Sequence, residues 1–290
     1  MQKKGVTVIT SMGGCMDYLL PLSVLEEHTL HFGADSPLDM ENLKKKLLGM
    51  GYERCAQAEA PGQFCFRGGI IDIFPLTEDN PVRIELWGDE IDSIRSFDAE
   101  SQRSIENLEE ITIYPASEIV LSPQVLKEGL ERIEKEKTAA VKKFRDAFLT
   151  EEGARLKQSV DEAVDCLKEF EDFSVAEHFL RYFYKDAVTF TDYFTTEETL
   201  VILDETNRLA EQGNAVETEF RESMEHRLEK GYLLSGQADL LISCKETIHK
   251  LNKKNGVSLC TIEQKKGEWD IQEQFHISAQ SVSPYNNSFE

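Results

Sequence analysis

The sequence contains no long apolar stretch. Apolar blocks such as residues 200–203 are far shorter than the ~18 residues that a transmembrane helix needs. The basic start is followed only by a short apolar stretch at residues 6–9, without a small-residue cleavage site, so no signal peptide is predicted. These absences predict a cytoplasmic protein that makes no membrane contact.

Positive charge is also scarce. The 32 lysines and arginines stand against 54 aspartates and glutamates, which gives a net charge of −22. A DNA-binding surface neutralises phosphates with lysine and arginine, and an acidic surface repels them. The composition therefore argues against duplex DNA as the main ligand of this chain, although a local basic patch stays open.

Paired cysteines and metal-ligand spacings are missing. The six cysteines stand far apart, and none forms a C-x-x-C pair. An even count permits a disulfide framework, but reduced thiols are expected in a chain of this size without a secretion signal. His28 and His31 are three residues apart, and neither a cysteine nor a second histidine pair accompanies them. We therefore predict no metal and no cofactor.

A phosphate-binding loop is absent as well. Residues 199–206 read TLVILDET, an apolar run followed by Asp204 and Glu205, which is typical of a Walker B strand. ATP hydrolysis also needs G-x-x-x-x-G-K-[ST], and no such sequence occurs in the 290 residues. No catalytic residues are predicted, and we expect the chain not to be an enzyme. The alternative, a nucleic-acid-binding or ATPase accessory segment of a helicase, is kept open.

The sequence has instead a β-rich segment between helical ones. Apolar residues alternate with polar ones from residue 52 to 113, and the predicted strands are 52–58, 63–67, 70–74, 82–87, 90–97 and 111–114. Gly88-Asp89 between two such runs predicts a tight hairpin. Helices are predicted at 16–20, 39–48, 122–148, 151–170, 176–184 and 205–230, and further strands at 6–10, 29–32, 199–203, 238–242 and 257–261.

The strand at residues 82–87 carries the most informative pattern. Val82, Ile84 and Leu86 should face one way, and Arg83, Glu85 and Trp87 the other. An arginine and a tryptophan on an open sheet face are typical of interaction hot spots. The segment from residue 47 to 126 also contains five arginines and no lysine. Two interpretations remain: the arginines bind carboxylates of a partner, or they pair with acidic residues across the sheet.

Two longer motifs carry a family resemblance. Residues 64–75 read FCFRGGIIDIFP and residues 82–98 read VRIELWGDEIDSIRSFD. They resemble the R-G-x-[IL]-[IL]-D-[IL]-F-P and R-[IL]-[DE] signature shared by the bacterial transcription-repair coupling factors (Mfd) and the repair protein UvrB. The continuations SQRS at 101–104 and IYPA at 113–116 are more similar to Mfd than to UvrB. The rest of the chain is compatible with the amino-terminal region of Mfd in order and length.

The resemblance implies an α/β fold in which a UvrB-like, β-rich module is attached to a degenerate helicase-like domain. The expected division is a remnant of a truncated helicase-like domain at 1–26, the UvrB-like module at 27–118, a mostly helical α/β remainder at 119–280, and a linker or the start of a further domain at 281–290.

The resemblance also implies a function and a site. The module would dock UvrA to stalled transcription complexes without being catalytic. The contact residues of the family fall on Arg67, Arg83 and Trp87, with Trp87 in place of a common phenylalanine. A second implied partner is the carboxy-terminal region of the parent protein, which would mask the same face.

Overall fold

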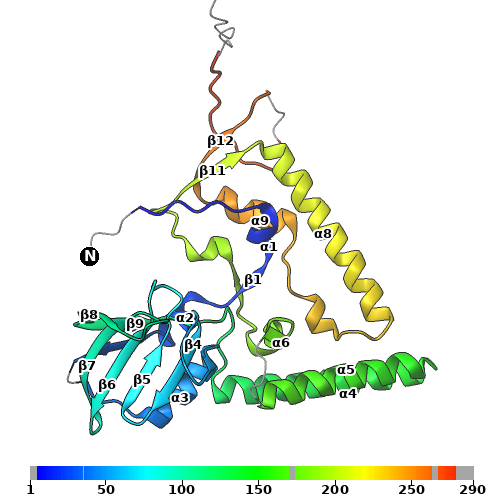
Figure 1. Cartoon of the computed structure of the whole chain (residues 1–290). Coiled ribbons are helices and arrows are strands. Elements are labelled where there is room, and N and C mark those ends of the chain that lie inside the picture. The colour runs from blue at the N-terminus through cyan, green and yellow to red at the C-terminus, as the bar shows by residue number, and fades with distance from the viewer. Residues whose placement is uncertain (1–4, 35, 170–173, 263–266, 279–290) are drawn as a thin grey trace, which may run out of the picture.

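The computed structural model describes residues 5–34, 36–169, 174–262 and 267–278. Figure 1 shows a β-rich lobe, a long helical hairpin beside it, and a smaller α/β part at the other end of the molecule, where the first described residues also lie. The expected α/β architecture is confirmed. Within the described residues, no helix is long and apolar enough to cross a membrane.

The β-rich lobe is built on a six-stranded sheet with the order β3-β4-β5-β6-β7-β8. Its pairs are antiparallel, except that β3 and β4 are parallel. The strands are β3 (Glu53–Arg54), β4 (Gln63–Arg67), β5 (Ile70–Ile73), β6 (Val82–Trp87), β7 (Glu90–Phe97) and β8 (Ser104–Leu108). Most of the predicted strands are confirmed. The prediction for residues 52–58 was too long, and β8 was missed.

A separate strand pair and a helix complete the lobe. The pair is β2 (Leu30–Gly33) with β9 (Glu110–Ile113), and the helix is α3 (Met40–Gly49). Asp39 caps α3 by accepting hydrogen bonds from the backbone N–H groups of Glu41 and Asn42, both at 3.1 Å. Leu43 and Leu47 of α3 belong to one buried cluster with the apolar side chains of β5 and β6.

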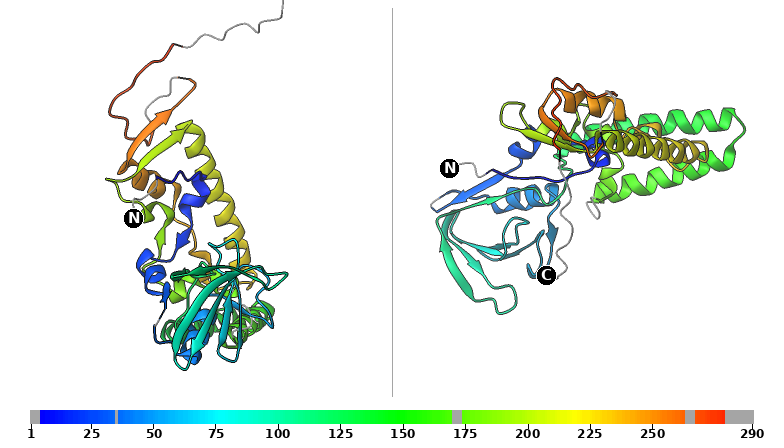
Figure 2. Two further views of the ribbon diagram at one scale, coloured as in Figure 1. Left: turned by 60° about the vertical axis from the view of Figure 1, so that its left-hand side comes forward. Right: turned by 90° about the horizontal axis from the view of Figure 1, so that it is seen from above.

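The helical hairpin consists of α4 (Pro123–Asp146) and α5 (Thr150–Glu169). Ser122 caps α4, and a proline occupies its first turn, as predicted from the sequence. The predicted helix at 176–184 was wrong in one respect, because the segment splits into α6 (Ser174–Glu177) and α7 (Leu180–Phe183). α8 (Thr206–Glu229) slopes towards the far end of the hairpin (Figures 1 and 2), where Arg155 Nη1 donates to the backbone oxygen of Lys230 at 2.5 Å.

The α/β part holds a two-stranded parallel sheet, β11 (Leu200–Asp204) with β12 (Asn255–Leu259). A second buried cluster joins Met16, Ile248 and Trp269. The remaining elements are α1 (Met12–Met16), β1 (Tyr18–Leu19), α2 (Leu22–Glu27), β10 (Val188–Thr189), η1 (Phe190–Tyr193), η2 (Ser235–Ala238) and α9 (Cys244–Asn252).

Three sequence predictions in this part were wrong. Residues 6–10 have no regular secondary structure and pair with no described strand, and Ile9 is almost fully exposed, so an apolar run alone did not make a sheet strand. Residue 238 ends the short helix η2, and residues 239–242 form no strand of their own: they make an isolated bridge between Asp17 and Leu241, flanked by backbone hydrogen bonds to Met16 and Tyr18. The helix expected at 16–20 ends at Met16, and Tyr18–Leu19 pairs with β10 instead. The linker expected at 281–290 lies outside the described residues.

Candidate functional site: an arginine-rich face of the sheet

One face of the six-stranded sheet carries a row of charged and polar side chains. Asp72 is the direct cross-strand partner of both Cys65 and Arg83, and Arg83 is in turn the partner of Arg95. Directly opposed residues of neighbouring strands point to the same side of a sheet. The row therefore crosses four strands on one face, while Val82 and Ile84 of β6 are buried on the other.

Asp72 is the centre of this row. Its side chain is fully buried, and its carboxylate accepts hydrogen bonds from Arg67 Nη2 at 2.5 Å, Arg83 Nε at 2.6 Å and Arg83 Nη2 at 2.8 Å. A buried charge is tolerated only when it is paired and hydrogen-bonded. Two guanidinium groups on one carboxylate leave the trio with a net charge of +1, which favours a further anion.

Arg83 contacts Gln102 and Phe97 in addition to Asp72. Its Nη2 also donates to Oε1 of Gln102 at 2.9 Å, and its guanidinium carbon lies 4.3 Å from the centroid of the Phe97 ring. Hydrogen bonding to Asp72 raises the pKa of Arg83 above its ordinary value, against the opposing effect of burial. The side chain is only 15% exposed, and its observed hydrogen bonds use Nε and Nη2, so the Nη1 edge is the part that remains for a partner.

Arg67 and Trp87 are far more accessible. The Arg67 side chain is 47% exposed, and its one hydrogen bond to Asp72 uses a single nitrogen. Trp87 is 83% exposed at the end of β6, opposite Glu90, which confirms the hairpin predicted at Gly88-Asp89. Gly88 has φ = +66°, a backbone conformation that glycine adopts at no steric cost.

The structure thus brings Arg67 and Arg83 together on Asp72 and places Trp87 at the end of the same strand as Arg83. The sequence had also allowed the arginines to pair with acidic residues across the sheet. The structure shows such pairs for two of them, Arg83 with Asp72 and Arg95 with Glu85. We call Arg67, Asp72, Arg83, Trp87 and Gln102 the arginine surface.

Sequence reasoning missed Asp72 and Gln102. One signal was available for Asp72, a charged residue inside the apolar run 70–74 of a predicted buried strand, which requires a cationic partner. Gln102 gave no signal of that kind. It lies in the loop between β7 and β8 with φ = +59°, and its approach to Arg83 depends on the fold of that loop.

The Walker B-like segment forms hydrogen bonds with another part of the chain. β11 ends at Asp204, and the next residue, Glu205, adopts φ = +55° and accepts hydrogen bonds from the backbone N–H and the hydroxyl of Thr261, at 2.8 and 2.5 Å. These hydrogen bonds lower the pKa of Glu205. Glu205 is therefore engaged in joining β11 to the segment after β12.

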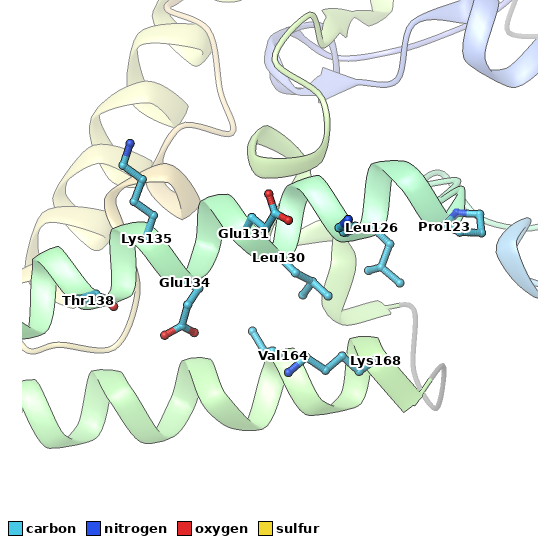
Figure 3. A pocket seen from close by; sticks show the side chains of 10 residues that line it. Pro123, Leu126, Leu130, Glu131, Glu134, Lys135, Thr138, Val164 and Lys168 are labelled. Carbon is cyan, nitrogen blue, oxygen red and sulfur yellow. The ribbon is translucent and has the colours of Figure 1, made fainter.

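Two other features of the protein bear on ligand binding. Across the described ranges, no group of three or more histidine, cysteine, aspartate or glutamate side chains has a geometry suited to a metal ion. A groove of about 860 Å³ runs between α4 and α5 (Figure 3), with Leu130 and Val164 on its floor. It contains none of the residues of the arginine surface.

The β-rich lobe coincides with the stretch of the chain that matches a known protein family. Residues 30–119 match the family described as the UvrB interaction domain, and this stretch contains both β2–β9 and the whole six-stranded sheet. The β-rich lobe is therefore similar to the UvrB interaction domain.

The chain as a whole is similar to proteins named transcription-repair-coupling factor. Identity is 35% over 227 residues with the protein of Bacillus subtilis, which covers 78% of this chain and 19% of that protein. It is 31% over 240 residues with that of Staphylococcus haemolyticus (81% and 20%) and 30% over 250 residues with that of Staphylococcus aureus strain MRSA252 (85% and 20%). The predicted resemblance to this family is confirmed, and the chain spans about a fifth of the length of these relatives.

Proposed function

We propose that the arginine surface docks the nucleotide-excision repair protein UvrA, and that the chain thereby links UvrA to a stalled transcription complex without catalysing a reaction itself. Support comes from the UvrB interaction domain matched at residues 30–119 and from the similarity to transcription-repair-coupling factors. The division into a helicase-like segment at 1–26, the module at 27–118 and an α/β segment at 119–280 is part of the same proposal.

The observation that carries the proposal is the net positive trio of Arg67, Asp72 and Arg83 beside an exposed tryptophan. Arg67 and the Nη1 edge of Arg83 present donors suited to a carboxylate, and Trp87 supplies a large apolar surface. Tryptophan and arginine are the residue types that most often dominate binding energy at an interface. The partner surface should therefore offer acidic side chains around an apolar patch.

The test is calorimetric titration of the chain with UvrA of the same organism. Trp87→Ala and Arg67→Ala should each weaken binding by about 30-fold or more, corresponding to about 2 kcal/mol. Arg103→Ala is the matched control, because Arg103 is an exposed arginine of the same lobe outside the arginine surface. A folded wild type that does not bind UvrA would refute the proposal, and equal binding by all variants would refute the assignment of the site.

The carboxy-terminal region of the parent protein is proposed as a second occupant of the same surface. It would compete with UvrA, so that docking is suppressed until the two parts separate. Adding that region in trans should lower the apparent affinity for UvrA in proportion to its concentration. Unchanged UvrA binding in its presence would remove this masking role.

The alternative, a nucleic-acid-binding or ATPase accessory segment, has less support. The net charge of −22 opposes phosphate binding, and Glu205 of the Walker B-like segment is engaged with Thr261. A rise in melting temperature on adding Mg-ATP or duplex DNA would favour this alternative over docking.

A further inference from the structure

A groove of about 770 Å³ lies beneath the turn of the β6–β7 hairpin. It is bounded by β2, by the first turns of α3 and by the turn residues Gly88 and Asp89. Leu86 lines it, whereas Trp87 does not. Successive residues of a strand point to opposite faces, so the groove and the exposed tryptophan lie on the two sides of one hairpin.

The backbone around the groove is held in place by hydrogen bonds. The N–H of Leu38 donates to the backbone oxygen of Asp89 at 2.8 Å, and the N–H of Ile91 donates to that of Ser36 at 3.0 Å. Pro37 and Glu90 form an antiparallel bridge between these two contacts. The hairpin turn is thereby tied to the segment that enters α3, and the groove exists before any partner arrives.

The floor of the groove is apolar. Phe32, Leu38 and Leu43 are buried beneath it, and Met40 and Leu86 are half-buried, so the apolar surface available to an entering side chain comes mainly from Met40 and Leu86.

The rim of the groove is mainly acidic. Asp39, Glu41 and Asp89 are all exposed, against one lysine, Lys46, and His31. None of the ion pairs between described residues involves these three carboxylates. A complementary ligand therefore combines an apolar side chain with lysine or arginine.

We propose that this groove is a second docking site for the partner of the arginine surface, and that it takes a segment with an apolar side chain flanked by basic residues. The inference rests on the proposed function. Trp87 and Gly88 are consecutive, so a protein that buries the tryptophan passes directly over the turn that forms the groove rim. The partner contacts both sides of the β6–β7 hairpin. Its carboxylates face the arginine surface, and its lysine or arginine side chains face the groove.

The experiment compares UvrA affinity of the wild type with that of Glu41→Lys, Asp89→Lys and the double variant. Each single charge reversal should weaken binding roughly tenfold, and the double variant should weaken it further. Glu222→Lys is the matched control, because it makes the same charge change at an exposed position of α8. Melting temperatures of all variants are measured alongside to confirm that each is folded.

A second measurement needs no variant. Amide hydrogen exchange of residues 38–43 in the wild type should slow when UvrA is added. If UvrA binds the wild type but the groove variants bind equally well and exchange is unchanged, the second site is refuted while docking at the arginine surface stands. If UvrA does not bind the folded wild type, both proposals fall together.

Discussion

Arg83 and Asp72 form a two-point contact between neighbouring strands, with Nε 2.6 Å from Oδ1 and Nη2 2.8 Å from Oδ2. Asp72 is fully buried, so the contact satisfies a charge that has no access to water. The same contact fixes the guanidinium plane and leaves its Nη1 edge for a ligand. One ion pair therefore contributes both to the stability of the sheet and to the shape of the arginine surface.

Removing the buried carboxylate should be costly. Asp72→Ala leaves Arg83 largely buried and without its main partner, and we expect the free energy of unfolding to fall by about 3–5 kcal/mol. Asp79→Ala, which removes an exposed carboxylate from a loop of the same lobe, should change it by less than about 0.5 kcal/mol. Urea denaturation of both variants measures the difference, and equal stability would show that Asp72 is not an essential partner.

Reversing the charge of Arg83 should strongly destabilise the lobe, in addition to any effect on binding. Arg83→Glu places a second carboxylate beside Asp72 in a site that is 15% exposed, where two like charges repel strongly. Arg83→Lys keeps the positive charge but loses the two-point geometry, and should be the milder change. Thermal unfolding should rank the wild type above Arg83→Lys and Arg83→Glu last. Wild-type stability in Arg83→Glu would contradict the buried pairing described here.

The sequence predicted the β-rich lobe well because its signals are local. Alternation at residues 82–87 gave the faces of β6, and Gly88-Asp89 gave the hairpin. Arg67, Arg83 and Trp87 were named from the family motif, and the strand pattern independently named two of them. Their assignment as contact residues stays a prediction.

The errors arose where structure depends on distant partners. β8 reads SIENL, with mostly exposed side chains, and it is a strand only because β7 pairs with it. Residues 6–10 show the reverse, since an apolar run that pairs with no described strand forms no regular secondary structure. The contact between Gln102 and Arg83 joins residues 19 positions apart through a loop whose conformation no local pattern specified.

Helix α4 should not tolerate a methyl group at Gly129. A Cβ there would lie 2.1 Å from Cδ1 of Phe183, whose ring is buried against α4. Gly129→Ala should therefore destabilise the protein by about 1–3 kcal/mol, although alanine favours a helix more than glycine does. The control is the same substitution in a Phe183→Ala background, which removes the clashing ring atoms, so the additional loss should be smaller. Equal losses in both backgrounds, measured by urea denaturation, would exclude the clash as the cause.

The contact between η1 and α9 should make stability depend on acid pH. Partial burial raises the pKa of Asp192, but hydrogen bonds from Lys250 Nζ at 2.6 Å and from Thr189 outweigh it, and the net pKa is lowered. A carboxyl whose pKa is lower in the folded state stabilises the protein above its unfolded pKa, roughly 3.9 for aspartate. This stabilisation is lost as pH falls through the folded value.

Asp192→Asn tests this dependence, because asparagine keeps the shape of the side chain and cannot titrate. At pH 7 the variant should melt at a lower temperature than the wild type, and the gap should shrink as pH falls below about 4, since the wild type then loses the same ion pair. Differential scanning calorimetry across this range measures the gap directly. A gap that stays constant from pH 7 to pH 3 would mean that the charge of Asp192 does not contribute to holding α9 against η1.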